Sequence, residues 1–492
     1  MRLSNLLQAS ILLQFFTIQV VFGQDTKVNL SALFDTLHAR RNFDGCVLIA
    51  RKGEVMFEKA YGLADEASAR PINTKTLFEL ASVSKQFTAM AVMQLKAKGL
   101  LAYSDSIQKF LPGLPYKGVT IRDLLVHTAG IPDFLGWDEA DLDVSRVNTN
   151  EDILKELPAK YPSVAFPAGT RYAYSNTNYL LLACIVEKLS GIPIAEYLDR
   201  NVFQPAGMLD TKAYSRRSAS TKLANYANSY FWDPAAQCYV HMDSVASYAL
   251  HMDGIVGPYG ISSNVGDLFR WDQALYTEKL LSRAELREAF QPSLLKNGRD
   301  LVKTPSGMIS GFGWEIIPDP DSGSLEMFHS GGYGGYANLI VRNTGKKETV
   351  ILLSNHKAMV DVYAIMTAID DILNNAPVAI PDRVINPKSV PTKAAQLATF
   401  AGNYAPTVAP GFKFRIRIKG NRLYAKAQDG IESPIYAASA DTFFFADADA
   451  KIRFSKDNNG KVEKLILIQD GQETPMLRID PVPAIPHNLP SH

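Results

Sequence analysis

Hydrophobic residues recur along the chain with two periods, one typical of helices and one typical of strands. In residues 82–99, Phe87, Ala91 and Leu95 follow one another at four-residue spacing, which predicts a helix with one buried face. Similar spacing predicts further helices at 25–41, 119–132, 178–190, 264–277 and 358–374. Residues 133–160 are acidic and irregular, and we expect them to form a flap over a site.

Strand-like segments lie on both sides of these helices. Residues 45–62 are predicted to form a hairpin, and strands are predicted at 311–317, 336–343 and 348–355. Along the chain, the predicted helices therefore lie between an N-terminal pair of strands and a C-terminal group of strands. We therefore predict an α+β fold, in which N- and C-terminal strands meet in one antiparallel sheet flanked by helices.

The pattern changes near the C-terminus. Residues 376–396 contain four prolines and are predicted to be a linker. From Phe412 to Lys419 apolar and basic residues alternate strictly, and short strand-like segments follow. We predict a small antiparallel β domain at 397–482, a barrel or a sandwich, whose alternating cations form a solvated face.

The first residues predict export. Residues 1–23 combine Arg2 with an apolar run, and Val21 and Gly23 suit a cleavage site, so a signal peptide is expected to end before Gln24. Glutamines within the run argue against a membrane span, and none is expected after signal removal. We therefore predict a periplasmic or secreted protein with its main domain at 24–375.

The composition narrows the possible partners. The 492 residues are 47% apolar with a formal net charge of +1, which favours large cores and gives no reason to expect nucleic acid. Three cysteines are too few for a disulfide framework. No cofactor motif is present, and two His-Met-Asp motifs, at 241–243 and 251–253, lack a third cluster, so we expect no metal site. The expected partner is a small-molecule or peptide substrate.

Candidate chemistry lies at the start of the helix predicted at 82–99. Ser82 would lie at the helix N-terminus, where unpaired N–H groups favour negative charge, and Lys85 would lie one turn along the same face. An amine whose pKa is lowered by burial can accept the serine proton, so Ser82 is a candidate nucleophile. The spacing alone is not specific, because Ser-x-x-Lys also occurs at Ser106, Ser293 and Ser354.

Two further motifs offer partners for Ser82. Tyr174 and Asn176 lie in a loop that leads into an apolar helix, where a phenol can move a proton and an amide can orient a substrate or a lysine. His329 to Gly332 would form a glycine-rich strand edge with a free N–H for an oxyanion hole. Each motif also fits ordinary loop chemistry, but their order and spacing together favour a site.

The order of these segments resembles the serine β-lactamase and penicillin-binding protein superfamily, closest to its class C β-lactamase, D,D-peptidase and esterase branch. The resemblance covers roughly residues 30–375 and rests on LFELASVSKQFTAMAV, IRDLLVHTAGIPDF, YSNTNYLLLACIVEKLSG and FHSGGYGGYANL. It implies an antiparallel sheet of several strands, flanking helices and a helical lobe, with the site between sheet and lobe. The C-terminal domain is similar to a lipocalin-like appendage of some members.

The resemblance implies a role for each motif. Ser82 would be the acyl-accepting nucleophile, Lys85 and Tyr174 its proton-transfer partners, and Asn176 a substrate-orienting group. The backbone N–H groups of Ser82 and Gly332 would form the oxyanion hole. We also expect a charged Lys85 to lower the pKa of Tyr174, which would let the phenol act as the deacylation base.

One residue departs from the β-lactamase pattern. His329, followed by Gly331 and Gly332 in the substrate-binding segment, stands where β-lactamases have the lysine of Lys-Thr-Gly. With an ordinary pKa of about 6.5 it would be mostly neutral at pH 7 and charged near pH 5.5. We therefore expect poor hydrolysis of anionic β-lactams at neutral pH.

The function predicted from the sequence is that of an exported serine hydrolase that forms an acyl-enzyme with an ester or amide and needs no cofactor. A first alternative is a D-amino-acid peptide hydrolase, a D,D-carboxypeptidase or a weak β-lactamase. A second alternative is a penicillin-binding or scaffold protein with little turnover.

Overall fold

The computed structural model describes residues 26–138, 141–220, 222–357, 361–382, 388–407, 412–428, 430–446, 448–469 and 471–479, and the predicted signal peptide lies outside these ranges. The chain divides into two compact units. The first, here called the sheet unit, consists of Met1–Tyr230 and Ser247–Arg383. The second, the barrel unit, consists of Phe231–Ala246 and Val384–His492.

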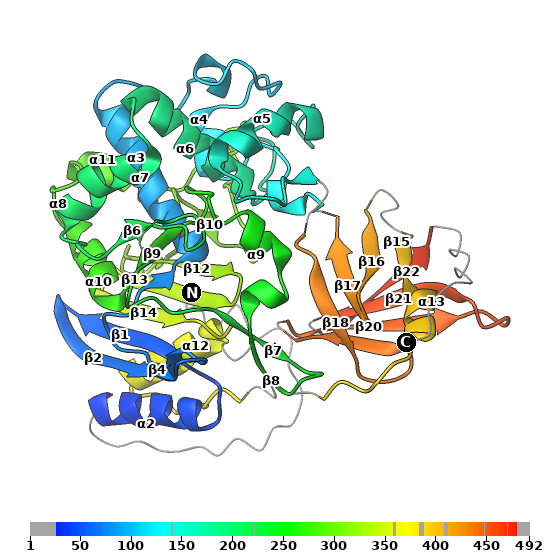
Figure 1. Cartoon of the computed structure of the whole chain (residues 1–492). Helices are drawn as coiled ribbons and strands as arrows, with labels where there is room; N and C mark the ends of the chain where they lie inside the picture. The colour runs from blue at the N-terminus through cyan, green and yellow to red at the C-terminus, as the bar shows by residue number, and fades with distance from the viewer. Residues whose placement is uncertain are drawn as a thin grey trace. The chain divides into compact units, whose positions relative to one another are not determined.

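A seven-stranded antiparallel sheet forms the centre of the sheet unit (Figure 1). Its strands, in spatial order, are β10 (Ile309–Ser310), β11 (Glu315–Pro318), β12 (Leu325–Tyr333), β13 (Tyr336–Asn343), β14 (Glu348–Ser354), β1 (Gly45–Arg51) and β2 (Glu54–Tyr61). Strand β1 pairs with β14, from Cys46 opposite Leu353 to Arg51 opposite Glu348. The predicted meeting of N- and C-terminal strands is therefore confirmed.

Helices cover both faces of this sheet because its central strands are buried on both sides. Figure 1 shows α2 (Thr26–Ala39) and α12 (Val362–Leu373) on one face, and α3 (Lys85–Ala97) and α10 (Val265–Ala274) on the other. The apolar strand β14 is buried along its whole length, as expected for a strand between two helical layers.

The strand prediction for 311–317 is only partly right. Glycines at its start break the strand, since Gly313 has φ 75° and lies so close to the first turn of α3 that a Cβ atom would come within 2.9 Å of its backbone. The hydrogen-bonded strand β11 begins at Glu315. The sequence predicts a strand edge only at 329–332, whereas β12 begins at Leu325, because its His-Ser-Gly-Gly segment has low strand propensity.

The helical predictions hold for α6 (Asn176–Ser190) and α10, but two others need correction. The short helix predicted within 119–132 ends earlier than expected, because α4 (Ile121–Leu125) stops just before His127, which has φ 59°. Residues 133–160 are not irregular throughout, because they end in α5 (Asn150–Lys160). Its N-cap is Thr149, whose N–H donates to Asp152 Oδ2 over 2.8 Å. None of the described helices alone has the length and apolar composition to cross a membrane. One bent pair, 176–190 with 194–206, reaches that length and composition only when the two helices are taken together.

A closed eight-stranded barrel dominates the barrel unit, which confirms the predicted all-β domain. Its strands are β15 (Gly402–Pro406), β16 (Phe414–Lys419), β17 (Arg422–Ala427), β18 (Ser433–Ala437), β19 (Thr442–Phe445), β20 (Ala450–Lys456), β21 (Val462–Gln469) and β22 (Gln472–Arg478). Helix α13 (Ala394–Phe400), which begins inside the predicted linker, contributes Phe400 to the barrel core. On β16 the predicted alternation buries Phe414 and Ile416, whereas Ile418 is exposed.

A hairpin from the middle of the chain belongs to the barrel unit. It comprises β7 (Tyr230–Asp233) and β8 (Cys238–His241), and nearly all of it lies within Phe231–Ala246. The Phe231 ring stacks on Tyr436 at 6.2 Å, and Asp233 pairs with Arg422 at 2.9 Å. The sequence pattern places this segment inside the 24–375 domain, because neither of these long-range contacts has a local signal.

Candidate active site

Ser82 lies in a tight turn held against the sheet. The turn is a 3₁₀ helix, Ala81–Ser84, that leads directly into α3. Ala81 has φ 52°, a left-handed conformation that is unfavourable for a residue with a side chain, and its N–H donates to Glu79 Oε1 over 3.2 Å. On β12, a Cβ atom at Gly331 would lie 2.2 Å from the Leu80 carbonyl oxygen, so only glycine allows the strand to approach the turn.

Lys85 is fully buried beside Ser82. Its Nζ lies 3.1 Å from Ser82 Oγ, 2.8 Å from Asn176 Oδ1 and 2.9 Å from the Pro258 carbonyl oxygen. Burial lowers the pKa of Lys85 to about 7, although the nearby charge of Asp133 opposes this shift. A lysine in this place therefore exchanges its proton near neutral pH, unlike a lysine on the surface.

Tyr174 contacts Ser82 from another side. The Tyr174 hydroxyl lies 2.8 Å from Ser82 Oγ, and Lys85 Nζ is 4.8 Å from the centre of the ring. Tyr174 is 39% exposed, while desolvation of its hydroxyl raises the pKa of Tyr174 well above its usual value. The expectation of a lowered phenol pKa is therefore wrong, because desolvation outweighs any attraction by a lysine that is itself easily deprotonated.

Asn176 is the first residue of α6, and its side chain points to Lys85. Asp133 Oδ2 accepts hydrogen bonds from both Asn176 groups, its backbone N–H at 2.9 Å and its Nδ2 at 2.8 Å. Because Nδ2 is bound to a carboxylate, Oδ1 is the atom that faces Lys85. The structure therefore brings Ser82, Lys85, Tyr174 and Asn176 together, as the motifs predict.

His329 is buried next to the same cluster. Its ring centre lies 6.4 Å from that of Tyr174, and its Nδ1 lies 2.6 Å from the Ser330 carbonyl oxygen, to which it donates. Desolvation, followed by the charge of Lys85, lowers the pKa of His329 to about 4. The expected protonation of His329 between pH 7.5 and 5.5 is therefore wrong, and the imidazole stays neutral over this range.

The outer edge of β12 is open from His329 onward. Strand β11 pairs with β12 only as far as Phe328. A two-residue turn joins Tyr333 to its partner Tyr336, so these two residues form a hydrogen-bonded pair of β12 and β13. Hydrogen-bonded and non-hydrogen-bonded pairs alternate along an antiparallel ladder, so the N–H of the next residue, Gly332, points away from β13. This N–H consequently faces the open edge, which agrees with the predicted role of Gly332.

His127 is a residue of the site to which the sequence assigns no role. Its ring stacks on Tyr174 at 4.4 Å between centres, and its Nδ1 accepts a hydrogen bond from the Ser175 backbone N–H over 3.2 Å. Burial lowers the pKa of His127 well below its usual value, so the ring supports Tyr174 as a neutral group. The segment HTAG that contains it belongs to one of the family motifs, which is the only available signal.

The other Ser-x-x-Lys motifs have different surroundings. Ser106 caps a short 3₁₀ helix by accepting the Gln108 N–H, and its Lys109 pairs with Asp105 at 2.9 Å. Lys296, three residues after Ser293, donates to the Gly118 carbonyl oxygen. Ser106, Lys109 and Lys296 therefore have structural partners outside the Ser82 cluster, whereas Lys357, three residues after Ser354, lies near Gly332, where an added Cβ atom would be 3.9 Å from its Nζ.

The two His-Met-Asp motifs also have partners of their own. His241 accepts the Asp243 N–H, and Asp253 pairs with Arg217 at 2.9 Å. Within the described residues, no group of three or more histidine, cysteine or carboxylate side chains is arranged to hold a metal ion.

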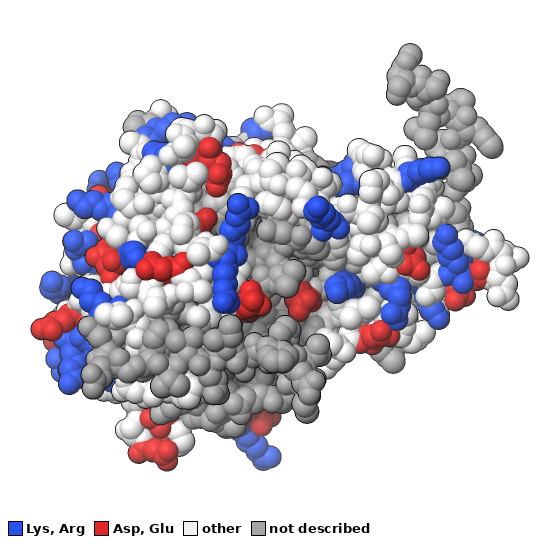
Figure 2. Space-filling model, turned by 90° about the horizontal axis from the view of Figure 1, so that it is seen from below, with Lys and Arg blue, Asp and Glu red and all other residues white. Residues whose placement is uncertain are grey.

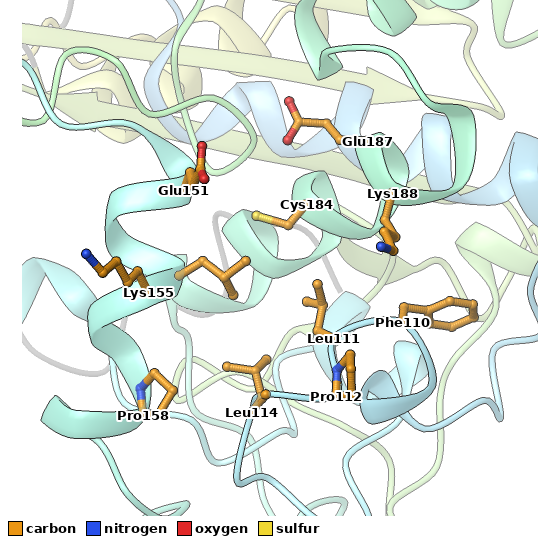
Figure 3. Close-up of a pocket in the computed structure, with 12 residues that line it drawn as sticks. Phe110, Leu111, Pro112, Leu114, Glu151, Lys155, Pro158, Cys184, Glu187 and Lys188 are labelled. Carbon is orange, nitrogen blue, oxygen red and sulfur yellow. The ribbon is translucent and has the colours of Figure 1, made fainter.

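A separate hollow of about 630 Å³ lies among the helices (Figure 3). Leu111, Leu114 and Pro158 give it an apolar lining, with Glu151 and Glu187 near one end. Burial strongly raises the pKa of its Cys184 thiol, which is therefore no nucleophile at neutral pH.

Charged side chains on the face seen in Figure 2 are of both signs, with lysine and arginine interspersed among aspartate and glutamate. This mixture agrees with the formal net charge of +1. It gives no reason to expect a polyanionic partner on this face.

Comparison with known proteins agrees with the geometry around Ser82. A family model described as Beta-lactamase matches residues 30–372, well over half of the chain. The chain belongs to the β-lactamase family. A second family model, described as a domain of unknown function, matches residues 386–477, within the barrel unit.

Individual relatives of this β-lactamase-family chain match nearly all of it or a smaller part. Penicillin-binding protein 4* of Bacillus subtilis (strain 168) is 34% identical over 458 residues, 92% of this chain and 99% of the relative. Esterase EstB of Burkholderia gladioli is 34% identical over 200 residues, 37% of this chain and half of the esterase. The structure of the octameric penicillin-binding protein homologue from Pyrococcus abyssi has the same fold, with a TM-score of 0.60, 22% identity, and coverage of 91% of this chain and 99% of that one. The protein is a serine hydrolase of this family.

Proposed function

We propose that this hydrolase forms an acyl-enzyme on Ser82, with neutral Lys85 as the general base. The observation that carries the proposal is the set of three contacts around Lys85 Nζ, because a neutral amine has two N–H donors and one lone pair. Its donors match the carbonyl oxygens of Asn176 and Pro258, and its lone pair then faces the Ser82 hydroxyl. With a pKa of about 7, much of Lys85 is in this form at neutral pH.

Tyr174 completes the proton path as a neutral acid. Its hydroxyl donates to Ser82 Oγ, so the serine can accept one hydrogen bond while donating its own proton to Lys85. As Ser82 Oγ attacks the carbonyl carbon, its proton moves to Lys85, and Tyr174 protonates the leaving oxygen or nitrogen. Lys85 then returns a proton to Tyr174. Deacylation follows the same route in reverse, with water in place of the leaving group.

The negative charge formed on the carbonyl oxygen needs donors that are already in position. We assign this role to the backbone N–H groups of Ser82 and Gly332. Ser82 lies at the N-terminal end of α3, and the Gly332 N–H faces the open edge of β12. Both are fixed by backbone geometry, so they require no rearrangement when the charge develops.

We propose small, uncharged esters or amides as the preferred substrates. His329 has no positive charge at neutral pH with which to bind a substrate carboxylate. The similarity to an esterase supports ester hydrolysis. D-amino-acid peptides are the second candidate class. The predicted signal peptide supports export to the periplasm or the exterior as a further part of this proposal.

Identification of the adduct would test this function. The protein is incubated with an activated ester or a fluorophosphonate, digested, and analysed by mass spectrometry. We expect the mass increase on the peptide that contains Ser82, together with continuous turnover of chromogenic esters. Labelling of another residue would contradict the mechanism, and a stable Ser82 adduct without turnover would indicate a binding protein in place of an enzyme.

A further inference from the structure

Asp133 is a carboxylate of the site that lies one contact away from the reacting groups. It follows the short helix α4 in sequence, and its Oδ2 accepts both N–H groups of Asn176. Its Oδ1 accepts the Leu135 N–H over 3.0 Å, and its carbonyl oxygen accepts the Tyr161 hydroxyl over 2.9 Å. Backbone and side chain of Asp133 are thus both held, and the carboxylate cannot turn away from Asn176.

The contact between Asp133 and Asn176 determines which atom of the Asn176 amide faces Lys85. The two ends of an asparagine amide have nearly the same shape, and only their hydrogen-bond partners determine which end faces which neighbour. Asp133 accepts from Nδ2, and Oδ1 therefore faces Lys85 Nζ at 2.8 Å. A turned amide would instead present an N–H to the amine, and the amine lone pair would then point to Asn176 and away from Ser82.

Asp133 also influences Lys85 by its charge, since a nearby anion raises the pKa of the amine while burial lowers it. Lys85 in turn opposes the rise in the pKa of Asp133 that burial causes. The other titratable groups facing the pair are neutral at pH 7, because burial lowers the pKa of the histidines and raises the pKa of the phenols. They are His127, His329, Tyr174, Tyr179 and Tyr259.

We propose that Asp133 is a positioning residue that acts through Asn176 to aim the Lys85 lone pair at Ser82 and through its charge to set the pH at which Lys85 becomes a base. This inference rests on the proposed acyl-enzyme function. Asp133 itself touches neither Ser82 nor, in the proposed mechanism, the substrate.

Acylation kinetics in the full-length protein can test this role. The rate of the p-nitrophenol burst is measured with p-nitrophenyl acetate from pH 5 to 9. For Asp133→Asn, we expect the plateau rate to fall about ten- to a hundredfold, because a misdirected base is inefficient. We also expect the midpoint of the rising limb, near pH 7 in the wild type, to move to lower pH by up to about one unit, because the anion that stabilises protonated Lys85 is lost.

Two variants separate charge, geometry and simple stability. Asp133→Glu keeps the charge on a longer side chain and should lower the plateau while leaving the midpoint in place. Asp123→Asn removes another buried carboxylate, one that accepts from Thr120 and Thr128. It should lower the melting temperature without moving the midpoint. This control shows what a purely structural carboxylate does.

The outcomes are distinct. An Asp133→Asn protein that retains both the wild-type plateau within about twofold and the wild-type midpoint overturns the inference. A lower plateau with an unmoved midpoint overturns the charge role. If Asp133→Asn does not fold, the pH profile of the burst rate in Asp133→Glu is used in its place. A midpoint of that profile that differs from the wild type overturns the charge role. A wild-type protein without a burst or a Ser82 adduct refutes the proposed function instead.

Discussion

The sheet unit and the barrel unit fill their interiors with different kinds of side chain. The barrel core is apolar, and its centre is a cluster of aromatic rings in which Phe454 lies 4.4 Å from Phe400 and 5.7 Å from Phe443. In the sheet unit, the region around Ser82 buries Lys85 and Glu79. The charged residues of β16 lie on the half-exposed side of its alternation.

The difference shows where the chain accepts a cost in stability. Burying a polar group costs about 1–3 kcal/mol unless it is hydrogen-bonded, and burying a charge costs more. Glu79 accepts the N–H groups of Ala81 and Gly260, which it can do as a neutral acid, since burial raises its pKa to about 8. Side chains of this kind gather around the nucleophile in the sheet unit, whereas the core cluster of the barrel consists of apolar side chains.

The largest effect is expected from removal of the nucleophile. Ser82→Ala should abolish covalent labelling and lower kcat/KM by several orders of magnitude, because the two-step route disappears. Ser106→Ala is the matched control, since Ser106 belongs to the same Ser-x-x-Lys pattern but caps a helix. More than a few per cent of wild-type activity in Ser82→Ala would mean that the site lies elsewhere.

Truncation of the aromatic cluster should affect only stability. Phe454→Ala leaves a cavity among Phe400, Tyr404 and Phe443 and should lower the free energy of unfolding of the barrel by about 3–5 kcal/mol. Denaturation followed by circular dichroism measures this change. Ester hydrolysis under native conditions should keep its wild-type kcat, and a large loss there would show that the barrel core supports the site.

Replacement of the buried amine should have opposite effects on activity and stability. The pKa of Lys85 falls from 10.5 in the unfolded chain to about 7 in the folded protein. Protonation of Lys85 therefore destabilises the native state by its full amount below about pH 7, and this destabilisation disappears above about pH 10.5. Lys85→Met should therefore lose acylation. The difference in free energy of unfolding between Lys85→Met and the wild type should be about 3–5 kcal/mol larger, in favour of the variant, at about pH 7 than at about pH 10. Urea denaturation at both pH values gives this difference, and equal values would contradict the lowered pKa.

The smallest effect concerns substrate charge. His329→Lys should raise the ratio of kcat/KM for anionic over neutral substrates about ten- to a hundredfold, because a charge-assisted hydrogen bond to a carboxylate is gained. His329→Gln, which stays neutral, should leave the ratio unchanged. In the wild type the ratio should be flat between pH 7.5 and 5.5, since the pKa of His329 is about 4. A ratio that rises over this range would place a titrating cation next to the substrate.

Periodicity and motif order suffice to predict much of this structure. Continuous apolar segments predict that β1 meets β14, strict alternation predicts the barrel, and four-residue spacing predicts α3. Motif order predicts the cluster of Ser82, Lys85, Tyr174 and Asn176. The roles of Asp133, Glu79 and His127 could not be assigned from the sequence, because each residue acts largely through contacts with residues far away along the chain. The pKa values of Tyr174 and His329 could not be predicted for a related reason: both are set by desolvation, which depends on the packed structure.

The pairing of β1 with β14 also has a consequence for biosynthesis. Arg51 and Glu348 face each other across this ladder, so during translation β1 waits for its partner on the order of tens of seconds at ordinary elongation rates. Until then the nascent hairpin of β1 and β2 leaves the β1 edge unpaired in addition to the outer edge of β2, which is a hazard for aggregation. The exposed Glu54 and Glu58 on β2 place charge on the newly made hairpin and discourage association with other chains during this interval.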